Sequence, residues 1–78
     1  MTSDGVVMKA FLRRFRFERG ELSQQAVADM VSVSRQTIIA IERGDYSPSV
    51  KLALLLANAL ETTVEALFEL EEDDHAQT

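Results

Sequence analysis

Glutamine, arginine and small methyl-bearing side chains gather on one side of a short predicted helix. Gln36, Ala40 and Arg43 fall at positions i, i+4 and i+7, so they share a helix face. Glutamine can form two hydrogen bonds with adenine and arginine two with guanine, and a threonine or alanine methyl can pack on the methyl of thymine. Arg35 and Thr37 add the same chemistry beside Gln36. These groups could read the edges of bases in DNA.

Two short helices joined by a tight turn are needed to position these side chains. Ser23 and Ser34 each precede an apolar run, where a serine hydroxyl can accept a hydrogen bond from a free backbone N–H at a helix start. We therefore predict helices over residues 24–30 and over residues 35–42 or 43. Their inward-facing residues, with one in the turn, are Val27, Ala28, Val31, Val33, Ile38 and Ile41. This is the format of a helix-turn-helix DNA reader.

Residues 22–49 follow the pattern L-S-Q-x-x-[VL]-A-x-x-[VL]-x-V-S-R-Q-T-I-x-x-I-E-x-G-x-Y-x-P-S. This pattern resembles the helix-turn-helix family of phage Cro and lambda-type repressors, also called the XRE family. Residues 64–70 resemble the family's fifth helix, and its first helix is matched by Leu12, Phe15, Arg16 and Gly20. The resemblance implies an all-α, five-helix lambda-repressor-like DNA-binding domain, with the helix-turn-helix formed by its second and third helices.

Start and stop signals along the chain agree with five helices and no strand of consequence. The predicted helices cover residues 8–19, 24–30, 35–42 or 43, 50–60 and 64–70. Gly20 and Gly44 are expected to end the first and third helices, and Ser49 and Thr63 to cap the last two. The expected organisation is a flexible leader over residues 1–7, one helix-turn-helix domain over residues 8–70, and an acidic, mobile tail over residues 71–78.

Three residues depart from the family pattern near the predicted turns. Ser32 and Glu61 stand where glycines are common, and Glu21 resembles one extra residue before Leu22. A residue with a side chain adopts a left-handed backbone at a higher energy than glycine does. We therefore expect a costlier or altered backbone at these positions.

The resemblance implies DNA contacts at the starts of the two motif helices and just beyond the second. Base contacts are implied for Arg35, Gln36, Thr37 and Ala40. Phosphate contacts are implied for Ser23, Gln24, Arg43, Tyr46 and Ser47. Three of these residues have alternative roles. Arg35 could contact a phosphate instead of a base, capping alone explains Ser23, and Tyr46 could equally pack under its loop.

Arg16 and Glu42 lie on the inward faces of their predicted helices, where a charge needs a partner. The resemblance implies that they form a structural ion pair with each other. We favour this role over a DNA contact by either residue.

The formal net charge of −5 opposes binding to a polyanion, but the charge is unevenly distributed. Residues 1–48 carry seven Lys or Arg and six Asp or Glu, a balance of +1, whereas residues 49–78 carry one against seven, a balance of −6. The local potential at the contact decides how DNA is steered. An acidic C-terminal part can therefore coexist with DNA binding, although it weakens non-specific affinity.

The predicted helix over residues 50–60 is more apolar than one small core requires. Leu54 and Leu55 flank its polar side, which is centred on Lys51 and Asn58. A homodimer interface would explain this excess, with contacts from Leu54, Leu55, Leu67, Phe68 and Leu70. The alternative is coverage by the leader or the tail. We favour the dimer, because a chain of 78 residues buries only a modest core.

Several other classes of protein and site find no support. The chain has no cysteine, which excludes a disulfide framework and a thiolate metal site. No apolar run approaches the roughly 18 residues of a membrane span, and no secretory signal begins the chain. His75 with Asp73 and Asp74 could hold a metal weakly, but a solvated acidic end is the favoured interpretation. We expect no catalysis, cofactor, metal or small-molecule ligand, and a cytoplasmic location.

The predicted function is that of a sequence-specific DNA-binding transcriptional regulator. We expect a repressor that binds double-stranded DNA as a homodimer on a palindromic operator, with half-sites about 34 Å apart. One alternative is an antitoxin-type or other protein-interaction module with secondary DNA binding. Another is a helical domain that does not bind DNA.

Overall fold

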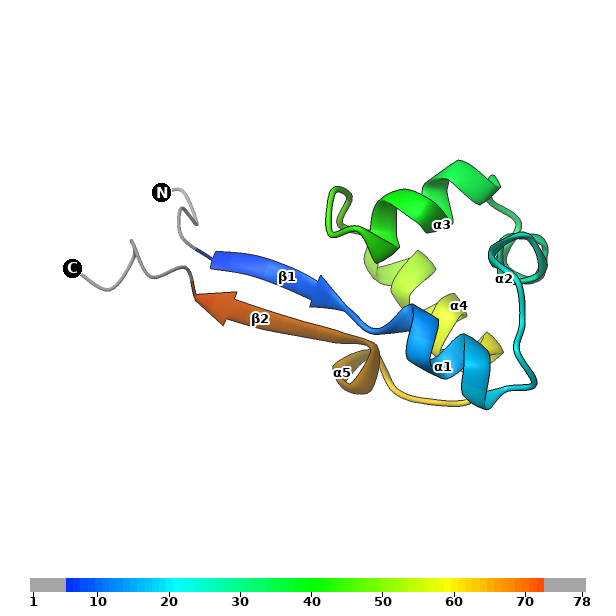
Figure 1. Ribbon diagram of the computed structural model, residues 1–78. Helices are drawn as coiled ribbons and strands as arrows, with labels where there is room; N and C mark the ends of the chain where they lie inside the picture. Colours follow the sequence, from blue (N-terminus) through cyan, green and yellow to red (C-terminus); the bar gives the residue numbers. More distant parts are fainter. Residues whose placement is uncertain (1–5, 73–78) are drawn as a thin grey trace.

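The computed structural model describes residues 6–72, which form five helices and two strands (Figure 1). In chain order these are β1 (Val6–Ala10), α1 (Leu12–Glu18), α2 (Gln24–Val31), α3 (Arg35–Glu42), α4 (Val50–Ala59), α5 (Val64–Leu67) and β2 (Phe68–Glu72). The helices gather at one end of the molecule, and β1 and β2 run side by side away from them as a ribbon (Figure 1). The helix α2 lies at the far end from this ribbon, and the C-terminal end of α3 lies close to β1 (Figure 1).

Four of these helices begin at the cap that the sequence predicts. Ser23 Oγ accepts a hydrogen bond from a backbone N–H three residues on, at 2.9 Å. Ser34 Oγ accepts the equivalent bond at 3.2 Å, and Ser49 and Thr63 do the same at the starts of α4 and α5. Each such cap is worth about 1 kcal/mol. The predicted starts of α2, α3, α4 and α5 are therefore confirmed.

The core forms where α2, α3 and α4 pack together, with contributions from α1 and α5. Its largest fully buried side chains are Leu12, Val27, Ile38, Ile41, Leu56, Leu60 and Leu67. Ala28 is also fully buried, and its small side chain lets α3 cross close to α2. The predicted inward faces of the two motif helices are confirmed.

The two-stranded sheet corrects the all-α prediction. Strands β1 and β2 are antiparallel, with Met8 opposite Leu70 and Ala10 opposite Phe68. The first helix begins at Leu12, because residues 8–10, predicted as its first turn, are extended in β1. The five predicted helices are all present, but a sheet joins the two ends of the described chain.

The same sheet shortens the last helix. The helix α5 ends at Leu67, and Phe68 takes an extended backbone with φ −133° and ψ 143°. The backbone N–H of Phe11 donates to the carbonyl oxygen of Leu67 at 2.8 Å, which ties the two ends of the ribbon to the helices. The strands reach into both predicted terminal segments, whose remaining residues, 1–5 and 73–78, lie outside the described residues.

Left-handed backbone occurs at all three positions that depart from the family pattern. The φ angles are 60° at Glu21, 61° at Ser32 and 55° at Glu61. The turn after α2 is closed by a hydrogen bond from the backbone N–H of Val33 to the carbonyl of Ala28, at 3.0 Å. A left-handed conformation costs a residue with a side chain roughly 1–2 kcal/mol. The expected strain is therefore present, and the turn still closes.

None of the helices within residues 6–72 is long and apolar enough to cross a lipid bilayer.

Candidate nucleic-acid interface

The helix α3 is anchored on one side and open on the other. Ile38 and Ile41 are fully buried in the core. Arg35 and Gln36 are exposed in the first turn, and Ala40 is half-buried one turn later. Because its apolar side is fixed in the core, the helix presents the N-terminal side chains in a defined orientation. This is the arrangement that reading of a major groove by a helix N-terminus requires.

Thr37 belongs to the cap of α3 as well as to its exposed side. Its hydroxyl lies 3.0 Å from Ser34 Oγ, and its backbone N–H donates to the same oxygen. The hydroxyl therefore helps to hold the start of the helix. The methyl group of Thr37 is the part left for an apolar contact with a base.

A nearly buried ion pair joins α1 to α3. Arg16 Nε donates to Glu42 Oε2 at 2.7 Å, and Arg16 Nη2 donates to Glu42 Oε1 at 3.2 Å. Both side chains are only 11% exposed. Arg16 Nη1 also donates to the carbonyl of Leu22 at 2.7 Å, just before α2. One guanidinium thus fixes α1, the approach to α2 and the end of α3 relative to one another.

Gln24, at the start of α2, completes this cluster. Its Nε2 donates to Glu42 Oε1 at 3.0 Å, and the side chain is half-buried. The amide is therefore already engaged inside the protein, where the sequence analysis placed a phosphate contact. Ser23 likewise uses its hydroxyl oxygen as the cap of α2. At both positions, the groups that can bind a phosphate are the free backbone N–H groups at the start of α2.

An open hollow of about 680 Å³ lies where the starts of α2 and α3 face α1. Arg13 and Arg35 contribute to its wall, together with Ser23, Gln24 and Gln25. Glu42 also borders it, but its charge is balanced by the ion pair with Arg16. The hollow therefore combines two cations with amide groups and a helix N-terminus, which suits the sugar-phosphate backbone of a nucleic acid.

The segment after α3 places three further predicted residues on the surface. Arg43 is exposed, and its Nε lies 3.3 Å from Asp45 Oδ2. Tyr46 and Ser47 are exposed in the loop that leads to α4. Arg43, Tyr46 and Ser47 are therefore exposed beyond the C-terminal end of α3, whereas the hollow lies at the starts of α2 and α3.

Residues 13–67, which include the motif helices and most of α1, match the helix-turn-helix family model HTH_3. The chain belongs to this helix-turn-helix family. Its relatives are named as HTH-type transcriptional regulators, and the XRE-type resemblance found in the sequence is confirmed. By family, the protein is a DNA-binding transcriptional regulator.

Three similar proteins illustrate the extent of the family match. An uncharacterized HTH-type transcriptional regulator of Methanothermobacter thermautotrophicus is 48% identical over 67 residues, which cover 85% of this chain and 96% of that protein. The HTH-type transcriptional regulator YgzD of Bacillus subtilis is 42% identical over 67 residues, covering 86% and 100%. The crystal structure of the restriction-modification controller protein C.AhdI from Aeromonas hydrophila aligns with a TM-score of 0.62 at 34% identity, covering 68% of this chain and 75% of that one.

Two residues of this HTH_3 protein join the hollow without having been predicted as site residues. The guanidinium carbon of Arg13 lies 5.6 Å from the centre of the Phe17 ring, and both side chains line the hollow. Arg13 and Phe17 are four residues apart, so they share one face of α1. The spacing predicts that Arg13 and Phe17 lie together on α1. That this face borders the hollow depends on where α2 and α3 pack, which the spacing does not show. The aromatic ring supports the cation over the starts of the motif helices.

The residues predicted for a dimer interface differ in their environments in this HTH_3 fold. Leu54 is 57% exposed and Leu70 is 72% exposed, whereas Phe68 is half-buried against the core. Leu55 is exposed as well but lines a different hollow, beside Met30. Leu67 is 0% exposed within the single chain, so its prediction as an interface residue is wrong. The side chain of Leu67 packs in the core, because α5 ends at this residue and the chain continues as β2.

Asp73, Asp74 and His75, the candidates for a weak metal site in the sequence, lie outside the described residues. Within residues 6–72, no group of three or more His, Cys, Asp or Glu side chains is placed to hold a metal ion.

Proposed function

We propose that this chain is a sequence-specific repressor that binds a palindromic operator as a homodimer in the cytoplasm. The proposal rests on how α3 is exposed and anchored. Arg35 and Gln36 are exposed in its first turn, while Ile38 and Ile41 fix the opposite side in the core. A rigid helix with free hydrogen-bonding groups at its N-terminus can enter a major groove and distinguish base pairs.

Base reading falls to four residues of α3 in this proposal. Gln36 pairs with adenine and Arg35 with guanine, each through two hydrogen bonds. The methyl groups of Thr37 and Ala40 pack on thymine methyls. Arg35 also lines the hollow beside Arg13, which supports a phosphate contact as its second role.

Phosphate contacts flank these base contacts. The backbone N–H groups behind Ser23 and Gln24 meet one strand at the start of α2, next to Arg13. Arg43, Tyr46 and Ser47 meet the backbone at the other end of α3. Contacts at both ends of the helix would fix its register in the groove without reading sequence.

A homodimer places two such helices on one duplex. Half-sites one helical turn apart, about 34 Å, match a two-fold symmetric protein, and the operator is then a palindrome. A dimer bound over a promoter excludes polymerase by occupancy, and this is the basis for proposing repression.

The deciding experiment is selection of bound sequences from a random duplex pool, followed by titrations of the selected site. We expect a palindromic consensus. Gln36→Ala should lose discrimination at one or two base pairs by roughly 1–3 kcal/mol each. Asn58→Ala is a matched control, because Asn58 is an exposed amide on α4, outside the α2 and α3 surface. Affinity should be measured at fixed salt by fluorescence anisotropy.

Two outcomes would contradict the proposal. Equal losses of Gln36→Ala on the selected site and on random DNA would remove the base-reading role of α3. Failure of the wild-type protein to bind any duplex at low salt would remove DNA binding itself.

A further inference from the structure

The ribbon has one apolar and one polar face. Residues that pair across antiparallel strands point to the same face, so Met8 and Leu70 share a face with Ala10 and Phe68. The opposite face carries Val7 and the charged residues Lys9, Glu69 and Glu71. Lys9 Nζ lies 3.4 Å from Glu71 Oε2, which closes a salt bridge on that polar face.

The apolar face of the ribbon continues onto α4 and α5. A hollow of about 380 Å³ is lined by Met8 and Phe68 from the ribbon and by Val50, Leu54 and Val64 from the helices. Val50 is 77% exposed at the start of α4. We call this surface the ribbon–α4 face, and its residues are Met8, Val50, Leu54, Val64, Phe68 and Leu70.

The outer half of the ribbon has no helix against it. Figure 1 shows β1 and β2 extending beyond the helices, with their inner parts next to α1, α5 and the end of α3. A two-stranded ribbon is marginal by itself and gains stability from a third strand or from a packed apolar face. Leu70, among the most exposed apolar side chains described, lies at the middle of the ribbon, opposite Met8. The ribbon therefore needs a surface to pack against.

The strand edges are poor places for that contact. On the β1 side, a Cβ added at Gly44 would lie 3.4 Å from the carbonyl oxygen of Met8, so the turn after α3 already covers part of this edge. The strand β2 carries Glu69 and Glu71, and acidic residues on an edge strand oppose pairing with a second copy. The face of the ribbon, and not its edge, is the part that can be covered.

The chemistry of the face favours a second copy of this chain as its occupant. Residues 73–78 contain no large apolar side chain, and residues 1–5 contain only Met1, so these segments offer little to cover it. Exposed charges of both signs border the face, with Lys51 next to Val50 and Glu65 next to Val64. A two-fold contact brings each surface against itself, so a border with both signs can pair across it. A polyanionic partner would instead favour a border of positive charges alone.

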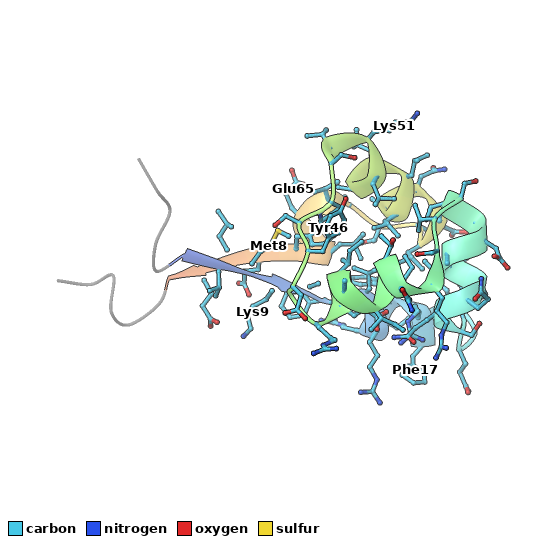
Figure 2. The ribbon with its side chains drawn as sticks, turned by 90° about the horizontal axis from the view of Figure 1, so that it is seen from above. Met8, Lys9, Phe17, Tyr46, Lys51 and Glu65 are labelled. Carbon is cyan, nitrogen blue, oxygen red and sulfur yellow. The ribbon has the colours of Figure 1, made fainter. Side chains whose placement is uncertain are left out.

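We propose that the ribbon–α4 face packs against the same face of a second copy about a two-fold axis. This inference rests on the homodimer of the proposed function and assigns its surface. Figure 2 shows Lys51 and Glu65 on the side of the molecule away from Phe17, which lines the basic hollow. Pairing through this face therefore leaves the starts of α2 and α3 free for DNA. Leu55 and Leu67 take no part in the contact.

Charge-introducing variants in matched pairs test this surface. Leu54→Lys is compared with Leu55→Lys, its exposed neighbour on α4 outside the face. Leu70→Lys is compared with Val7→Lys, an exposed residue on the polar face of the same ribbon. Sedimentation equilibrium of the full chain should show a wild-type dimer. Leu54→Lys and Leu70→Lys should each weaken dimerisation by at least about tenfold, and the two control variants by less than about threefold.

Circular dichroism melting identifies any variant that fails to fold. Because Leu54 and Leu70 are exposed and lie in different elements, one folded variant suffices for the test. The surface is wrong if both folded variants dimerise like the wild type, if either control dissociates the dimer equally, or if the wild type is a monomer. Wild-type binding to duplex at low salt is measured alongside. If the wild type is a monomer and binds duplex, the dimer surface is refuted and the DNA-binding function stands. If the wild type is a dimer that Leu54→Lys dissociates but binds no duplex, the dimer surface stands and the DNA-binding function is refuted.

Discussion

Arg16 of α1 and Glu42 of α3 are joined by two hydrogen bonds, of 2.7 and 3.2 Å, beneath the surface that carries the proposed DNA contacts. Gln24 donates to the same carboxylate at 3.0 Å. The pair thus connects the first helix to both motif helices. A change here should act on stability and on the geometry of the interface together.

Removing Glu42 should leave the Arg16 charge nearly buried without its partner. We expect Glu42→Ala to reduce the free energy of unfolding by about 3–5 kcal/mol, measured by urea denaturation. Arg14→Ala is the control, because Arg14 and Glu18 form an exposed pair on α1 at 3.3 Å. Exposed pairs contribute about 0–1 kcal/mol. Similar losses in the two variants would show that the buried pair has no special structural role.

The left-handed residue in the helix-turn-helix turn offers a stabilising change. Ser32 has φ 61° and is exposed, so glycine there removes backbone strain without opening a cavity. We expect Ser32→Gly to raise the free energy of unfolding by about 1 kcal/mol, with a matching rise in melting temperature.

Ser47→Gly is the control for the turn, since Ser47 is an exposed loop serine without a positive φ. Glycine at such a position adds freedom to the unfolded chain and should leave stability unchanged or slightly lower. A Ser32→Gly protein that melts at or below the wild-type temperature would show that the left-handed turn is not a source of strain.

Arg43 should contribute a phosphate contact that is independent of sequence. Arg43→Ala is expected to weaken operator and random DNA alike and to make the slope of log affinity against log salt shallower by about 0.9. Anisotropy titrations over a series of salt concentrations measure this slope. Arg19→Ala removes the same charge from the C-cap of α1, where Arg19 pairs with Glu61 outside the basic hollow, and should leave the slope unchanged. An unaltered slope for Arg43→Ala would refute the phosphate contact.

Elements that depend only on neighbouring residues could be predicted from the sequence. Ser23, Ser34, Ser49 and Thr63 marked the starts of four helices, because a cap bonds an N–H only three residues away. The spacing of Ile38 and Ile41 likewise predicted which side of α3 enters the core. The unusual residue in the turn, Ser32, was recognised from its position alone.

Features that depend on residues far apart in the chain could not be predicted from local patterns. The ribbon joins segments separated by about sixty residues, as in the Lys9 to Glu71 salt bridge, and neither strand shows its partner locally. The same pairing buried Leu67 and extended Phe68. The packing of α4 between α2 and the ribbon also put Leu54 and Leu55, neighbours in sequence, into different hollows. Caps and helix faces follow from local hydrogen bonding and periodicity, whereas strand pairing and surface exposure follow from packing of the whole chain, which no local pattern contains.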